Sequence, residues 1–249
     1  MKGGVGKTSI IYELAKELSR QGHSVCVMDA YFNMNVCSTM FEDRPGVDLK
    51  EYLCGNLKAY DVINETQYYN LYYVKSNSVT FDYLAQSELI KEFTVSVSCH
   101  FDFFLIDVNC FNERILNLML EVSSESMIIV NDQEDTIRNS MKLVQKVHLY
   151  SNINNISMTI NQARIIKEMK GQVLGEEEIE DILKQEILFI FPKFYKHNIF
   201  RSGMSVKKRY YIQKFCRAFL SNTKEILDYK KDYKGIFGMF KRRLYEKFE

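Results

Sequence analysis

The residues with the clearest chemistry lie in the first nine positions, where three glycines precede a lysine and a threonine. The segment reads Lys2-Gly3-Gly4-Val5-Gly6-Lys7-Thr8-Ser9 and runs directly into an apolar helical pattern. Glycines let the backbone curl so that successive N–H groups point at one anion, and a helix N-terminus adds partial positive charge. Lys7 is placed to reach the β- and γ-phosphates of a nucleotide, and the Thr8 hydroxyl to ligate Mg²⁺. The alternative interpretation, an ordinary glycine-rich turn before a helix, is weaker. Gly-Lys-Thr follows Gly-Gly at the spacing that a phosphate-binding loop requires.

The rest of the chain must supply a scaffold for this loop, and short apolar runs alternate in it with segments of helical period. Strands are predicted at 24–29, 71–75, 101–107, 127–130, 156–160 and 187–191, and helices at 10–18, 81–93, 113–122, 135–150 and 205–229. This alternation predicts an α/β fold with a mostly parallel sheet and helices on both faces. We expect one domain over residues 1–229, followed by a separate tail over residues 230–249.

Three polar residues fall at or near the carboxyl ends of predicted strands, namely Asp29, Asp107 and Asn161. Ligands bind at this edge of such sheets, so these residues are candidates for the site. The two acids could also simply cap the following turns, and Asn161 could be an ordinary turn residue.

Composition excludes several classes of protein. The 249 residues carry 33 Lys and Arg against 32 Asp and Glu, a net charge of +1 that argues against nucleic-acid binding over the whole surface and leaves only a local basic patch for such a partner. No uncharged apolar run approaches the roughly 18 to 20 residues that a spanning helix needs. The six cysteines form no CxxC pair and have no histidine at metal-ligand spacing, which predicts reduced thiols and a cytoplasmic protein.

The variant loop resembles the deviant Walker A motif of the MinD/ParA class of P-loop ATPases. Its extra lysine stands at Lys2, and Met1 occupies the place of the usual first glycine. The resemblance continues along nearly the whole chain. The later segments that match are Val27–Asn35 (switch I), Phe101–Asp107 (Walker B), Ile128–Arg138, Thr159–Asn161, Phe191–Pro192 and Arg201–Gly203.

The resemblance implies an ATP and Mg²⁺ site and a role for each matching residue. Lys2 would reach across an ATP-dependent homodimer to the partner's ATP, and Lys2, Lys7 and Asp29 would be the catalytic residues. Thr8 and Asp107 would hold Mg²⁺. The nucleotide would be bound by Gly3, Gly4, Val5, Gly6, Lys7, Thr8 and Ser9, with Asn161 and Pro192 at the adenine.

Two positions depart from the family pattern. The second switch I aspartate, which positions the attacking water, should fall where this chain has Tyr31. A tyrosine cannot serve as a carboxylate acceptor at neutral pH, because its pKa is about 10. The usual continuation of Walker B is replaced by Val108-Asn109-Cys110. We therefore expect ATP binding with slow hydrolysis or none.

The last twenty residues form a basic amphipathic segment. Residues 230–249 hold seven Lys or Arg against three Asp or Glu, and their apolar side chains recur at helical spacing: Ile236, Phe237, Phe240, Leu244 and Phe248. Such a helix can lie on an anionic lipid surface. It can also pack its apolar stripe on the body of the protein.

These features favour a nucleotide-dependent spatial regulator of cell division or flagellar placement, similar to MinD or FlhG. It would lie in the cytoplasm, peripherally on the inner face of the cell membrane, and act on a protein partner that no motif identifies. The alternatives are a non-hydrolysing localisation scaffold of the TadZ type, which Tyr31 favours, and a ParA-type DNA-partitioning ATPase. Because the loop opens the sequence and its fold requires a strand before it, we also expect the native protein to begin about 5 to 8 residues earlier.

Overall fold

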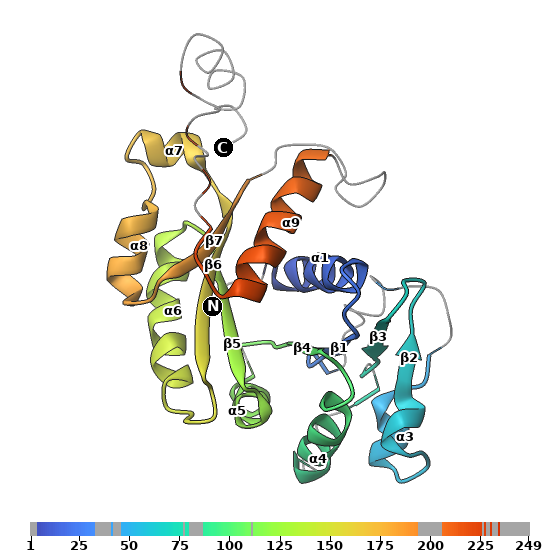
Figure 1. The fold of residues 1–249 in the computed structure, drawn as a ribbon. Helices are drawn as coiled ribbons and strands as arrows, with labels where there is room; N and C mark the ends of the chain where they lie inside the picture. The colour runs from blue at the N-terminus through green and yellow to red at the C-terminus, as the bar shows by residue number, and fades with distance from the viewer. Residues whose placement is uncertain are drawn as a thin grey trace. The chain divides into compact units, whose positions relative to one another are not determined.

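The computed structural model describes residues 4–32, 41, 46–76, 78–79, 87–110, 112–193, 206–225, 227, 230 and 234. Lys2, Gly3, residues 201–203 and nearly all of the tail lie outside these ranges. The chain divides into two compact units, residues Lys7–Ser124 and residues Met1–Gly6 with Glu125–Glu249. Each carries helices and a largely parallel sheet, so the predicted α/β class is confirmed (Figure 1). The predicted boundary at residue 229 stays a prediction.

The sheet of the unit Lys7–Ser124 has the order β2-β3-β1-β4. Strand β1 (Val25–Asp29) pairs in parallel with β3 (Leu71–Val74) and β4 (Phe103–Asp107), and β2 (Ile63–Glu65) runs antiparallel to β3. Every residue of β1 is buried, because both of its faces are covered. This explains why its sequence is a continuous apolar run instead of an alternating one.

Helices cover both faces of this sheet. They are α1 (Lys7–Arg20), the short α3 (Leu49–Leu53), the 3₁₀ helix η1 (Ala59–Val62), α4 (Ser87–Ser98) and α5 (Glu113–Val122), with α1 and α4 on opposite faces (Figure 1). Cys26 and Met28 of β1 enter one apolar cluster with side chains of α4 and α5. Helix α1 is terminated at Gly22, where His23 N donates to Leu18 O (3.2 Å) in a Schellman motif.

The other unit contains a parallel sheet of order β5-β6-β7. Its strands are β5 (Glu125–Val130), β6 (Asn155–Ala163) and β7 (Ile187–Pro192), and its helices are α6 (Glu134–Val147), α7 (Ile165–Met169), α8 (Glu176–Leu183) and α9 (Val206–Ser221). Helices α6 and α8 lie on one face of this sheet and α9 on the other (Figure 1). None of the helices in the described ranges is long and apolar enough to span a bilayer.

Two predicted helices have different ends in the structure. The last one was predicted to reach residue 229, but α9 ends at Ser221, since Asn222 adopts a left-handed backbone (φ +48°) and the described residues 223–225 are not helical. The helix predicted at 81–93 is described from Ser87 and continues to Ser98. The short helices α3, α7 and α8 were not predicted.

Candidate functional site

The glycines of the loop are shaped by the end of strand β6. Gly4 and Gly6 adopt left-handed backbone conformations (φ +90° and +87°), which glycine tolerates without a Cβ clash. The Asn161 Nδ2 donates a hydrogen bond to the Val5 carbonyl (2.7 Å), and a Cβ added to Gly6 would lie 2.4 Å from that nitrogen. The glycine at position 6 is therefore required by both its backbone angle and its neighbour.

Thr8 and Asp107, the two predicted Mg²⁺ ligands, are in contact in the unit Lys7–Ser124, and their role as ligands stays a prediction. The Thr8 hydroxyl, in the first turn of α1, donates a hydrogen bond to Asp107 Oδ2 at the end of β4. Asp107 is fully buried, and its Oδ1 has no hydrogen-bond partner among the described residues. Burial raises the pKa of Asp107 from 3.8 to about 6, although the hydrogen bond from Thr8 opposes this shift.

Asp29 stands beside Asp107, because β1 and β4 are parallel and in register at these two residues. It is buried, and its Oδ1 accepts a hydrogen bond from the backbone N–H of Tyr31 (2.9 Å). The negative charge of Asp29 also contributes to the raised pKa of Asp107. Two adjacent carboxylates at the carboxyl end of a parallel sheet form a place where a cation is stabilised.

Tyr31 contacts Lys7, the lysine that is predicted to bind phosphate. The Lys7 Nζ is 5.9 Å from the centroid of the Tyr31 ring, at the distance of a cation–π contact. Burial raises the pKa of Tyr31, and the nearby Lys7 ammonium lowers it in part. The phenol is therefore neutral at physiological pH and cannot accept a proton from water.

These residues fit Mg²⁺ in the manner of a P-loop. The orphaned Oδ1 of Asp107 and the Thr8 hydroxyl are oxygen donors of the kind that Mg²⁺ takes, with phosphate and water completing its shell. The described residues contain no group of three or more His, Cys, Asp or Glu that could hold a metal by themselves. An ion at this place would depend on nucleotide phosphates for part of its coordination.

The two residues predicted to contact adenine lie at the same end of neighbouring strands. Pro192 is the last residue of β7, and it pairs with Ala163 of β6, two residues beyond Asn161. The amide of Asn161 is engaged by the loop backbone in this structure. Contact with adenine stays a prediction for both residues.

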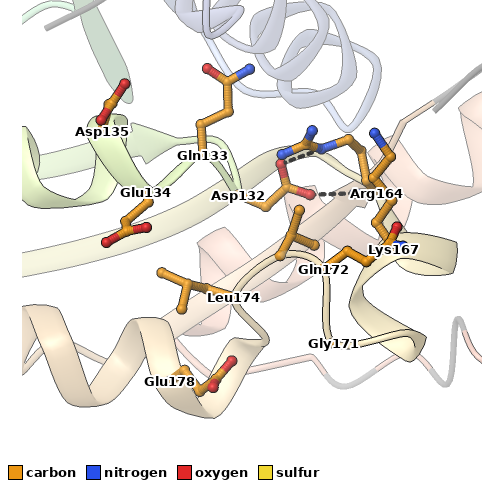
Figure 2. A pocket seen from close by; sticks show the side chains of 11 residues that line it. Asp132, Gln133, Glu134, Asp135, Arg164, Lys167, Gly171, Gln172, Leu174 and Glu178 are labelled. Carbon is orange, nitrogen blue, oxygen red and sulfur yellow. Dashed lines mark hydrogen bonds and ion pairs between the residues drawn. The ribbon is translucent and has the colours of Figure 1, made fainter.

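A cavity of about 710 Å³ opens near the end of β6, and none of the residues that line it was predicted as a site residue. Its walls come from the turn after β5 with the start of α6, from the start of α7, and from the segment leading into α8 with the first turn of that helix. The residues are Asp132, Gln133, Glu134, Asp135, Arg164, Lys167, Gly171, Gln172, Val173, Leu174 and Glu178. Figure 2 shows Arg164 turned toward Asp132, whose carboxylate accepts bonds from Arg164 N (2.7 Å) and Nε (2.9 Å). An acid after one strand and an arginine after its parallel neighbour are signals that could have predicted this pair.

An α/β fold whose glycine loop opens a helix next to a strand-end aspartate defines a P-loop nucleotide-binding protein. A family model described as an AAA domain matches residues 1–166. The septum site-determining protein MinD of Thermotoga maritima is 21% identical over 195 residues, which cover 77% of this chain and 72% of that protein. The chain belongs to the MinD/ParA class of P-loop ATPases.

Solved structures show the same fold. A chain of the MinC:MinD cell division complex of Aquifex aeolicus superposes with a TM-score of 0.75 at 20% identity, covering 92% of this chain and 96% of that chain. MinD of Pyrococcus horikoshii, solved with Mg-ADP, gives a TM-score of 0.72 at 20% identity over 91% of this chain and 96% of that chain.

Proposed function

We propose that this protein is an ATP-binding, membrane-associating spatial regulator of the MinD type, acting in cell division or flagellar placement. The observation that carries the proposal is the hydrogen bond between Thr8 and the buried Asp107, whose second oxygen has no partner among the described residues. In the proposed site Gly3, Gly4, Val5, Gly6, Lys7, Thr8 and Ser9 bind the phosphates. Thr8 and Asp107 hold Mg²⁺, which neutralises phosphate charge. The Mg-ADP in the Pyrococcus horikoshii MinD structure supports this choice of ligand.

Hydrolysis is slow in this proposal. Tyr31 lies against Lys7 at the position where the family pattern has a water-positioning aspartate, and a neutral phenol cannot replace a carboxylate there. Lys2 and Asp29 keep their proposed catalytic roles, Lys2 by reaching the nucleotide of a second copy. A bound ATP would then persist and hold the protein in one state for longer.

Membrane attachment would come from the basic amphipathic tail, residues 230–249. A single short apolar face binds lipid weakly, so an ATP-dependent homodimer would gain attachment by presenting two tails at once. The protein would lie peripherally on the inner face of the cell membrane and recruit a protein partner there. The MinC:MinD complex of Aquifex aeolicus supports a partner of this kind.

A second candidate function is a localisation scaffold of the TadZ type that binds ATP without a hydrolytic cycle. The aromatic ring over Lys7 favours it, because this contact stands where cycling members need an acid. A ParA-type DNA-partitioning role is disfavoured by the net charge of +1.

Co-sedimentation with vesicles of anionic phospholipid tests the proposal and separates the candidates. The full chain and a chain ending at Tyr229 are compared with ATP, with ADP and without nucleotide, all with Mg²⁺. Binding that needs the tail and increases with ATP is expected. Absence of lipid binding in every condition, with ATP binding retained, would contradict the MinD-type role and leave the scaffold.

A further inference from the structure

The side chain of Asn161 is held at both of its ends. Its Nδ2 donates to the Val5 carbonyl (2.7 Å), and its Oδ1 accepts from the backbone N–H of Gln162 (3.0 Å). The neighbouring Gln162 Nε2 lies 3.5 Å from the Gly4 carbonyl. Two consecutive carbonyls of the phosphate loop thus face amide donors from consecutive residues of β6.

The backbone of β6 is distorted at this place. Its register with β7 shifts between Ile160 and Ala163, and Gln162 adopts a left-handed conformation (φ +61°) although it is not glycine. A bulge of this kind re-aims side chains and is common beside functional sites. The left-handed conformation is unfavourable for a non-glycine residue, so the rest of the unit must stabilise it. The irregularity lies at Asn161 and Gln162, the two residues whose side chains face the loop.

Anchoring the two carbonyls fixes the direction of two N–H groups. In a planar trans peptide the C=O and the following N–H point in opposite directions, and the described chain has no cis peptide bond. A Val5 carbonyl held toward Asn161 therefore directs the Gly6 N–H away from Asn161. In the same way, a Gly4 carbonyl held toward Gln162 directs the Val5 N–H away from Gln162. Within the described residues neither N–H has a hydrogen-bond acceptor.

We propose that Asn161, aided by Gln162, is a positioning residue that orients the Val5 and Gly6 N–H groups of the phosphate loop toward a bound polyphosphate. This inference rests on the proposed function, since it concerns how that same loop is prepared for its anion. It assigns Asn161 an effect on phosphate binding that does not depend on a nucleobase.

Inorganic tripolyphosphate, which has no base, separates this role from a contact with adenine. We would titrate Mg-tripolyphosphate and Mg-ATP into the native chain and into Asn161→Asp and Asn161→Ala by calorimetry. Loss of one hydrogen bond weakens binding about tenfold. Asn161→Ala should lose about that much affinity for both ligands, and Asn161→Asp more, because its carboxylate repels the Val5 carbonyl.

Asn155→Asp is the matched control. It makes the same change at the other end of β6, where Asn155 Nδ2 donates to Asn222 Oδ1 (2.9 Å), and it should leave both affinities unchanged. Thermal unfolding identifies any variant that does not fold. If Asn161→Asp does not fold, the affinities of Asn161→Ala alone distinguish a role in phosphate positioning from a contact with adenine. Native affinity for tripolyphosphate in a folded Asn161 variant that binds ATP poorly would overturn the inference and assign Asn161 to the base. A native chain that binds neither ligand would overturn the proposed function, and the inference with it.

Discussion

Thr8 and Asp107 are 99 residues apart in the sequence, and the hydroxyl of one donates a hydrogen bond to the carboxylate of the other. The contact joins the first turn of α1 to the end of β4 and buries the carboxylate completely. A buried carboxylate with one unsatisfied oxygen is unfavourable without a cation. The arrangement therefore lowers the stability of the fold when no cation is bound, and it forms a site that a cation can occupy.

This relationship predicts the effect of Asp107→Asn on stability. The pKa of Asp107 is raised to about 6, so its stabilising contribution is complete below pH 4 and is lost as the pH rises through 6. Without nucleotide, the free energy of unfolding of Asp107→Asn should therefore exceed that of the native chain by about 1–3 kcal/mol at pH 8. At pH 4 the difference between the two should be smaller. Urea unfolding at the two pH values measures this. The same difference at both values would contradict it.

Tyr31→Asp should increase ATP turnover. The substitution removes the ring over Lys7 and supplies a carboxylate that can accept a hydrogen bond from water. Positioned acid–base groups contribute about 10²–10⁴-fold in other enzymes, so a gain of at least about tenfold is expected. Phosphate release is measured with saturating lipid. Tyr31→Phe keeps the ring and should remain as slow as the native chain. Fast hydrolysis by the native chain would contradict the assignment of Tyr31.

Gly6→Ala should abolish most ATP binding. Its φ of +87° strains any residue with a Cβ, and the new atom would meet Asn161 Nδ2 at 2.4 Å, so the loop must move. We expect at least about a tenfold loss of affinity from strain of about 1–2 kcal/mol. Gly22→Ala is the control, since it has a similar φ of +97° with open space around it. It should lower stability only. Native ATP affinity in Gly6→Ala would show that the loop is shaped differently.

Lys224→Met should destabilise the unit that contains α8. The Lys224 Nζ lies 2.8 Å from Glu176 and 2.6 Å from Glu180, and all three side chains are partly buried. Burial lowers the pKa of Lys224, but the two glutamates more than offset this and raise it. A loss of about 1 kcal/mol is expected in urea unfolding.

The exposed ion pair of Lys184 with Asp181, at 3.6 Å, supplies the comparison for this ion-pair network. Lys184→Met should change stability by no more than about 0.5 kcal/mol. Equal losses in the free energy of unfolding of Lys224→Met and Lys184→Met would show that partial burial does not strengthen the ion pairs of Lys224.

The sequence predicted the elements that carry the site, because their signals are local. An apolar run that ends in an acid predicted β1 with Asp29 and β4 with Asp107, and helical spacing over residues 10–18 predicted the middle of α1. The register of these neighbouring parallel strands, which the sequence did not predict, places the two acids side by side. The α/β class follows from the same alternation of elements.

Features that depend on long-range contacts could not be predicted in this way. Asn161 and Val5 are 156 residues apart, and their contact requires the bulge at Gln162, which no local pattern encodes. The end of α9 was also predicted wrongly, since helical spacing continues past Ser221. Tertiary ion pairs hold the next residues instead: Lys224 with α8 and Glu225 with Lys214.

Binding of Mg-ATP by the phosphate loop is the property on which the proposed function depends most, and calorimetric titration of the native chain and of Lys7→Ala measures it directly. We predict saturable binding of ATP at one site per chain, strengthened by Mg²⁺ and greatly weakened in Lys7→Ala. A native, folded chain that shows no saturable binding of ATP with Mg²⁺ present would contradict the account.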